Sequence, residues 1–180
     1  LCNVPFCLTV ANGTDALVIA LMVLDIGVGD EVIIPTNSFI ASAGAVIQTA
    51  ATPVFCDVLG DYNIDPDDVI KRITNKTKAI MPVHLTGRPA NLAAINEIAK
   101  RYDLFVIEDA AQAIGASMND KKVGSLGDIA AFSLHPLKNL FVPGDGGFIT
   151  TKCRYLHEKI KKLRNHGLID RNTCSIWGMN

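Results

Sequence analysis

Short apolar runs alternate with longer amphipathic stretches along the chain. The apolar runs are rich in Val, Ile and Phe, which predicts strands buried on both faces at residues 31–35, 52–58, 78–84, 104–109, 129–134 and 146–151. The spacing of apolar residues predicts helices at residues 14–25, 38–50, 65–74, 91–103 and 155–167. Ser38 and Asp65 are expected to cap two of these helices, the second with Pro66 at its first position.

This alternation predicts an α/β fold in which a mostly parallel sheet carries helices on both faces. Ligands in such folds bind at the carboxyl ends of the strands, so polar residues at those ends are the first candidates for chemistry. The sequence shows no internal repeat and no long polar linker, which favours a single domain over residues 1–180.

Composition narrows the function without changing the predicted fold. Hydrophobic residues make up 49% of the 180 positions, enough for a substantial core. A net charge of −1 without a basic block argues against binding to nucleic acid or an anionic membrane. No apolar stretch reaches the roughly 20 residues of a membrane span, and no signal peptide is visible. The five cysteines are scattered and form no CxxC pair, so we expect reduced thiols in a cytoplasmic protein without a metal site.

The segment ANGTDAL, residues 11–17, places a glycine at the start of a predicted helix. Free N–H groups at a helix start attract anions, Gly13 would let the backbone approach a phosphate, and the Thr14 hydroxyl would donate to it. The alternative is an ordinary helix start in which Thr14 or Asp15 caps its own first turn. The usual glycine-rich signatures of dinucleotide and nucleoside-triphosphate sites are missing.

In VIEDAAQAIGA, residues 106–116, an apolar strand leads into two carboxylates, Glu108 and Asp109. A carboxylate at a buried strand end is costly unless a cation or several hydrogen-bond donors accompany it. Gln112 follows closely enough to share the site. A helix-capping aspartate at a strand–helix junction explains the same residues, and the sequence does not choose between the two.

In FSLHPLKNL, residues 132–140, Ser133 ends a predicted strand and Lys138 stands among Phe, Leu and Pro. A lysine in an apolar pocket loses part of its preference for the charged form, and its amine becomes nucleophilic. The alternative is a surface lysine whose stem lies along a loop edge.

Taken together, a phosphate cradle, a strand-end carboxylate and an activated lysine are the three supports that pyridoxal phosphate needs. The cradle holds the phosphate, the carboxylate keeps the pyridine nitrogen protonated, and the lysine holds the aldehyde as an imine. Phe39 offers an aromatic face for the ring.

The order of motifs resembles that of the DegT/DnrJ/EryC1/StrS sugar aminotransferases, which are fold-type-I pyridoxal-phosphate enzymes. Nine segments carry this resemblance across nearly the whole chain: NGTDAL, GVGDEVIIPTNSFIASAGAV, ATPVFCDV, NIDP, PVHLTGRPANL, VIEDAAQAIGA, VGSLGDIAAFSLHPLKNL, GDGGFITT and LRNHG.

The resemblance implies a role for each matching residue. Lys138 would form the imine and Asp109 would pair with the pyridine nitrogen, so these two would be catalytic. His84 and His135 match positions where the family often has histidine, with a hydrogen-bonded structural histidine as the alternative. The complete cofactor-binding set would be Gly13, Thr14, Asp15 through its backbone, Phe39, Asp109, Gln112, Ser133 and Lys138.

The implied reaction transfers an amino group from an amino acid, glutamate in the family, to a nucleotide-linked keto-sugar. Arg88, Arg164 and Lys121 are candidates to bind the sugar's diphosphate. Residues 1–180 would form the pyridoxal-phosphate-binding large domain, truncated at both ends and without the family's small C-terminal domain. The active site would be shared between the subunits of a homodimer. The alternatives are a non-catalytic regulator or scaffold with the same fold, and a sugar dehydratase, against which Lys138 argues because those relatives carry histidine there.

Overall fold

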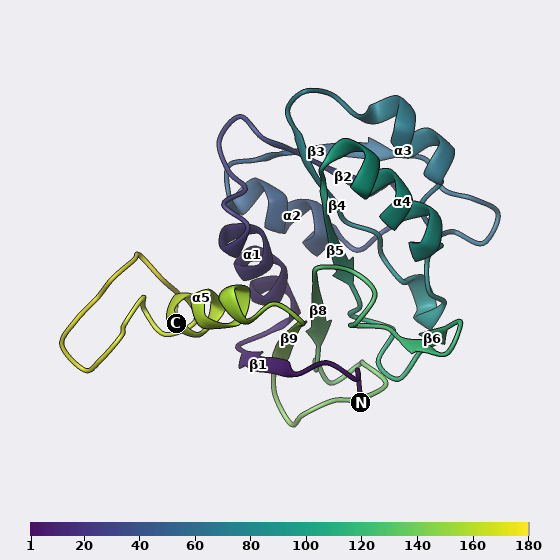
Figure 1. Ribbon diagram of the computed structural model, residues 1–180. Helices are drawn as coiled ribbons and strands as arrows, with labels where there is room; N and C mark the ends of the chain where they lie inside the picture. The colour runs from purple at the N-terminus through teal and green to yellow at the C-terminus, as the bar shows by residue number, and fades with distance from the viewer. Residues whose placement is uncertain (180) are drawn as a thin grey trace.

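Residues 1–179 are described by a computed structural model built around one seven-stranded sheet (Figure 1). The strand order across the sheet is β1-β9-β8-β5-β4-β2-β3. These strands are β1 (Phe6–Val10), β2 (Glu31–Pro35), β3 (Thr52–Cys56), β4 (Thr77–Ile80), β5 (Phe105–Asp109), β8 (Ile129–Ser133) and β9 (Gly147–Thr151).

The predicted α/β fold with a mostly parallel sheet is confirmed. Strands β3, β2, β4, β5 and β8 pair in parallel, as strand–helix alternation requires. Strand β9 pairs antiparallel with β8, and β1 pairs antiparallel with β9 at the edge. A small hairpin of β6 (Ser117–Met118) and β7 (Lys121–Lys122) was not predicted, because two-residue strands leave no periodic pattern.

Helices cover both faces of the sheet, as expected from the sequence (Figure 1). One face packs against α1 (Gly13–Val23), α2 (Ile40–Gln48) and α5 (Arg154–Leu163). The other packs against α3 (Pro66–Arg72) and α4 (Leu92–Tyr102), and a short 3-10 turn, η1 (Leu85–Gly87), follows β4. The segment after α5 projects away from the sheet in Figure 1.

One of the two predicted helix caps is confirmed and the other is wrong. The Asp65 carboxylate accepts a hydrogen bond from the Asp67 N–H, with Pro66 at the first helical position of α3. Helix α2 instead begins at Ile40 with Phe39 as its N-cap, and no side chain satisfies that cap. Ser38 therefore lies one residue outside the capping position, which leaves its hydroxyl free for another partner.

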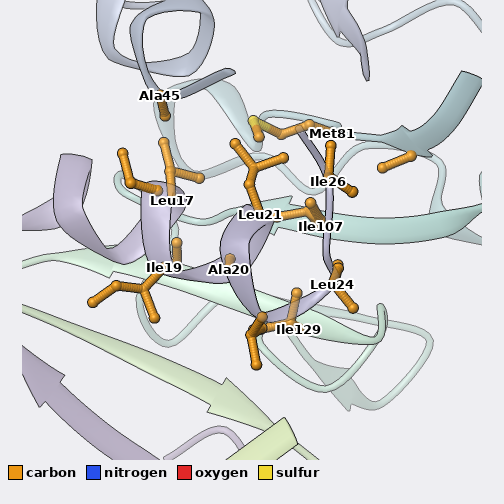
Figure 2. Close-up of a cluster of buried hydrophobic side chains, with 14 of the residues drawn as sticks. Leu17, Ile19, Ala20, Leu21, Leu24, Ile26, Ala45, Met81, Ile107 and Ile129 are labelled. Carbon is orange, nitrogen blue, oxygen red and sulfur yellow. The ribbon is translucent and has the colours of Figure 1, made fainter. Parts of the chain in front are cut away.

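Helix α1 forms the centre of the larger core cluster (Figure 2). Leu17 and Leu21 on α1 are almost completely buried and lie in one cluster with Ile107 of β5 and Ile129 of β8. This helix is apolar nearly all round, as expected for a helix enclosed between a sheet and other helices. The packing fixes the N-terminus of α1 against the carboxyl ends of the central strands.

Side chains alternate between the two faces along β5. Ile107 belongs to the core under α1 and α2, whereas Val106 belongs to the core under α4. Asp109 therefore faces the α1 and α2 side of the sheet, and Glu108 faces the opposite side. No helix within residues 1–179 is long and apolar enough to cross a membrane.

Candidate active site

A cavity of about 550 Å³ opens where β5 and β8 end and α1 begins. This is the edge at which a parallel sheet normally places its ligand. Nine of the ten site residues expected from the sequence line it: Gly13, Thr14, Asp15, Phe39, Asp109, Gln112, Ser133, His135 and Lys138. The tenth, His84, does not.

The N-terminus of α1 forms one wall of this cavity. Asn12 is the N-cap, and its Oδ1 accepts a hydrogen bond from the Asp15 N–H at 2.8 Å. Its Nδ2 donates to the Asp15 carboxylate at 3.0 Å. The capping role that the sequence offered as an alternative for Thr14 or Asp15 thus belongs to Asn12. The Asp15 N–H already has a protein partner. The N–H groups of Gly13 and Thr14, the first two residues of α1, are therefore the better phosphate donors.

Gly13 meets the end of β8 at very close range. A Cβ added at Gly13 would lie 2.7 Å from the Ser133 Cβ and 3.2 Å from its Oγ, so no larger residue fits without displacing the strand. The Ser133 Oγ accepts a hydrogen bond from the His135 N–H at 3.3 Å. Gly13 thereby brings the N-terminus of α1 and the Ser133 hydroxyl together at the cavity.

Asp109, the last residue of β5, also lines the cavity and is 5% exposed. Its Oδ2 accepts from the Ser42 hydroxyl at 2.7 Å, and its Oδ1 accepts from the Ala111 N–H at 3.3 Å. Burial raises the pKa of this carboxyl above its ordinary value, although the bond from Ser42 and the nearby Lys138 oppose the rise. A buried carboxylate of this kind favours a cationic ligand.

Glu108 and His84 form a separate buried pair on the opposite face of the sheet. The His84 side chain is completely buried, and its Nδ1 accepts from the Ala90 N–H at 3.1 Å. Its Nε2 therefore carries the proton and donates to the Glu108 Oε2 at 3.1 Å. Of the two possibilities weighed for His84, the structure favours the hydrogen-bonded structural histidine.

Lys138 is partly buried on the cavity wall, in the loop after β8. Its backbone N–H donates to the His135 carbonyl at 2.8 Å, which turns the loop back toward the cavity. The Gln112 Oε1 accepts from the Thr86 N–H at 2.8 Å, so this side chain is held at the rim. The Phe39 ring is 71% exposed and lines the same cavity, available to cover a planar ligand.

Two serines of the site were not predicted. The Ser42 hydroxyl bonds to Asp109, and the Ser38 and Ser42 Oγ atoms lie 2.6 Å apart. Ser38 also lines the cavity. Their spacing of four residues at the start of a helix was the available signal, since such residues face the same way.

The three cations considered for a sugar diphosphate lie outside this cavity. Arg88 pairs with Asp61 at 3.2 Å, and Arg164 donates to the Thr9 carbonyl at 2.7 Å. Lys121 stands on the β6–β7 hairpin. Within residues 1–179, no three His, Cys, Asp or Glu side chains gather as a metal site.

Comparison with known proteins confirms the resemblance seen in the sequence. A family profile described as the DegT/DnrJ/EryC1/StrS aminotransferase family matches residues 1–180. A dTDP-3-amino-3,6-dideoxy-alpha-D-galactopyranose transaminase from Aneurinibacillus thermoaerophilus is 52% identical over 167 residues, which cover 92% of this chain and 46% of that protein. The chain spans about half the length of the curated relatives it matches.

Solved structures agree on the fold. DesV from S. venezuelae, in complex with a ketimine intermediate, superposes with a TM-score of 0.97 at 44% identity, covering 99% of this chain and 48% of DesV. NtdA from Bacillus subtilis, with the cofactor PMP bound, superposes with a TM-score of 0.90 at 37% identity, covering 97% of this chain and 40% of NtdA.

Proposed function

We propose that this chain, which belongs to the DegT/DnrJ/EryC1/StrS aminotransferase family, is the cofactor-binding part of a pyridoxal-phosphate-dependent enzyme. The enzyme would transfer an amino group from an amino acid, glutamate by resemblance, to a nucleotide-linked keto-sugar. The observation that carries the proposal is that Lys138, buried Asp109 and the N-terminus of α1 line one cavity. Residues 1–180 would then form the large domain of that enzyme.

The residues of the cavity fit pyridoxal phosphate at each of its ends. The first amides of α1 and the hydroxyls of Thr14 and Ser133 suit a phosphate, and Gly13 allows the close approach. At the other end, Asp109 is a buried carboxylate that favours a protonated ring nitrogen. The Phe39 ring would cover the face of the cofactor, and Gln112 would lie beside it.

When bound, pyridoxal phosphate supplies an electron sink that makes the α-carbon of an amino acid acidic. Asp109 would keep that sink effective by holding the proton on the ring nitrogen. The Lys138 Nζ would hold the aldehyde carbon of the cofactor, and the same amine, when free, would take the proton from the substrate's α-carbon. The diphosphate of the sugar needs donors other than Arg88, Arg164 and Lys121, because none of these lines the cavity.

The rim of the cavity supports the proposed homodimer with a shared active site. Phe39 and Leu137 line the cavity and are 71% and 88% exposed. Large apolar side chains at the mouth of a binding site usually lie against a partner or a ligand. A second copy of the chain would cover them and supply further groups to the substrate.

Borohydride reduction of the cofactor-loaded protein tests the proposal. We expect a phosphopyridoxyl label on Lys138 after peptide mapping, and no label in a Lys138→Arg variant. Lys121, an exposed lysine on the β6–β7 hairpin that does not line the cavity, serves as the internal control and should stay unmodified. A label on another lysine, or none in loaded protein, would favour the non-catalytic regulator or scaffold. Loss of water from a keto-sugar without gain of an amine would favour the dehydratase.

A further inference from the structure

We propose that Ser38 and Ser42 form a hydroxyl relay that positions Asp109 as the ionised partner of the cofactor's ring nitrogen. The inference rests on the proposed function, because it concerns how the chain's own residues hold that cofactor. Ser42 is 1% exposed on α2, and its hydroxyl donates to the Asp109 Oδ2 at 2.7 Å. The Ser38 Oγ lies 2.6 Å from the Ser42 Oγ and belongs to the cavity wall.

The chemistry of the three groups fixes the direction of the relay. An ionised carboxylate only accepts hydrogen bonds, and a serine hydroxyl has a single proton to donate. Because the Ser42 proton points to Asp109, the Ser42 oxygen must accept its bond from Ser38. The relay therefore runs one way, from Ser38 on the cavity wall through the Ser42 hydroxyl of α2 to the Asp109 carboxylate. Each bond polarises the next and strengthens the donation to Asp109.

The relay supplies the short hydrogen bond that Asp109 receives. The bond from the Ala111 N–H is 3.3 Å long, whereas the bond from Ser42 is 2.7 Å. Short bonds to a charged acceptor are about twice as strong as neutral ones. The Ser42 hydroxyl stabilises the ionised form of Asp109, so the proton between Asp109 and the cofactor stays on the ring nitrogen. Without it, one proton would move from the ring nitrogen to Asp109, and the buried ion pair would become a neutral pair.

The same two serines also set the position of Phe39. Phe39 is the N-cap of α2, and no side chain satisfies that cap. Ser38 immediately precedes it and is tied to Ser42 one turn into the helix. The relay thus connects Phe39 with Asp109, both of which line the cavity. Ser42 and Ser38 are positioning residues, since they act on the cofactor through Asp109 and Phe39.

The test uses protein loaded with pyridoxal phosphate that is ¹⁵N-labelled at the ring nitrogen, whose chemical shift reports whether the nitrogen is protonated. In Ser42→Ala we expect the ratio of protonated to unprotonated nitrogen to fall about tenfold or more, and cofactor affinity to fall by a similar factor. In Ser38→Ala, which removes a neutral hydrogen bond, both should fall about two- to fivefold. Ser42→Thr keeps the hydroxyl, so the ratio of protonated to unprotonated nitrogen should stay at the value of the parent protein.

Thr49→Ala is the matched control. Thr49 caps the other end of α2, where its hydroxyl donates to the Val46 carbonyl at 2.8 Å. This variant weakens the same helix without touching the relay, so the nitrogen signal should not move. If Ser42→Ala fails to fold, Ser38→Ala decides, because it changes only a residue of the cavity wall.

The outcomes separate the relay from the proposed function. A parent protein that binds the cofactor with a protonated nitrogen, together with unchanged signals in Ser42→Ala or Ser38→Ala, would overturn the relay alone. An equal change in Thr49→Ala would also overturn it, because helix stability would then explain the effect. A parent that takes up no pyridoxal phosphate would overturn the proposed function and the relay with it.

Discussion

Glu108 and Asp109 are neighbours at the end of β5, yet the protein surrounds them in opposite ways. The Glu108 carboxylate accepts four hydrogen bonds, from the His84 ring and from three backbone N–H groups of residues 124–127. Asp109 accepts two, from Ser42 and Ala111, and faces the cavity. Both side chains are almost completely buried.

The difference shows how a structural carboxylate can be told from a functional one. A carboxylate has about four positions for hydrogen bonds, and the protein fills all of them at Glu108 but only half at Asp109. Burial raises the pKa of both groups, but at Glu108 the bonds from His84 and the loop outweigh it and lower the pKa. At Asp109 burial prevails and the pKa is raised. The unfilled positions of Asp109 leave it available to a cationic ligand.

Asp109→Asn tests the functional half of this comparison and should have the largest effect. A neutral amide cannot hold the proton on the ring nitrogen by charge, so we expect transamination to fall by at least about a thousandfold, about 4 kcal/mol on the activation barrier. Steady-state rates of the cofactor-loaded protein measure this. Turnover near that of the parent would remove Asp109 from its assigned role.

The same variant should keep or raise the melting temperature of the cofactor-free protein. Because the folded pKa of Asp109 is raised, its ionisation opposes folding, and stability falls as pH rises through its ordinary value. At neutral pH the asparagine removes that cost. Asp103→Asn, on an exposed residue after α4, is the control and should change neither rate nor stability.

Glu108→Gln tests the structural half. Glutamine places an NH₂ group where one carboxylate oxygen accepts two donors, so at least two buried donors lose their partner. We expect the free energy of unfolding to fall by about 3 kcal/mol, because each buried donor left without a partner costs about 1–3 kcal/mol. Urea unfolding measures it, with the exposed Glu97→Gln on α4 as a control that should stay within about 0.5 kcal/mol.

The pH dependence of Glu108 has the opposite sign to that of Asp109. Its folded pKa is lowered, so its contribution is complete above the ordinary value of about 4.3 and is lost as pH falls through the folded value. Glu108→Gln should therefore flatten the loss of stability below about pH 4.3. An acid profile as steep as that of the parent would contradict the role given to Glu108.

The sequence predicted the architecture better than it predicted this distinction. Buried strands leave continuous apolar runs, so six of the seven strands and the parallel sheet followed directly, and the strand ends pointed to Asp109 and Lys138. The edge strand β1 was not predicted, because its residues are only partly buried. The residue pattern alone presented Glu108 and Asp109 as equivalent candidates, and only the family resemblance singled out Asp109. Their roles are decided by His84 and the loop 124–127, which approach from distant parts of the chain. No local pattern reports such contacts.

The capping residue at the start of α1 was likewise not predicted from the sequence. Sequence preference allowed Thr14 or Asp15 to cap the helix, since Thr and Asp are both good N-caps. Asn12 fills that position in the structure, because its backbone is extended and its side chain reaches the Asp15 N–H. Thr14 is then left on the cavity wall. As at the end of β5, a residue bonded within the protein lies beside one that is left to the cavity.

Replacing these two residues separately gives the smallest predicted effects. Thr14→Ala should weaken pyridoxal phosphate binding by roughly 10- to 150-fold, the value of one hydrogen bond to a charged group, and leave the melting temperature unchanged. Asn12→Ala should cost about 1 kcal/mol of stability through the lost cap. Its effect on cofactor affinity should be smaller, because the α1 amides and the Thr14 hydroxyl remain. Cofactor titration beside a melting curve for each variant separates the two. A stability loss in Thr14→Ala with unchanged affinity would place Thr14 with the structural residues and remove it from the phosphate site.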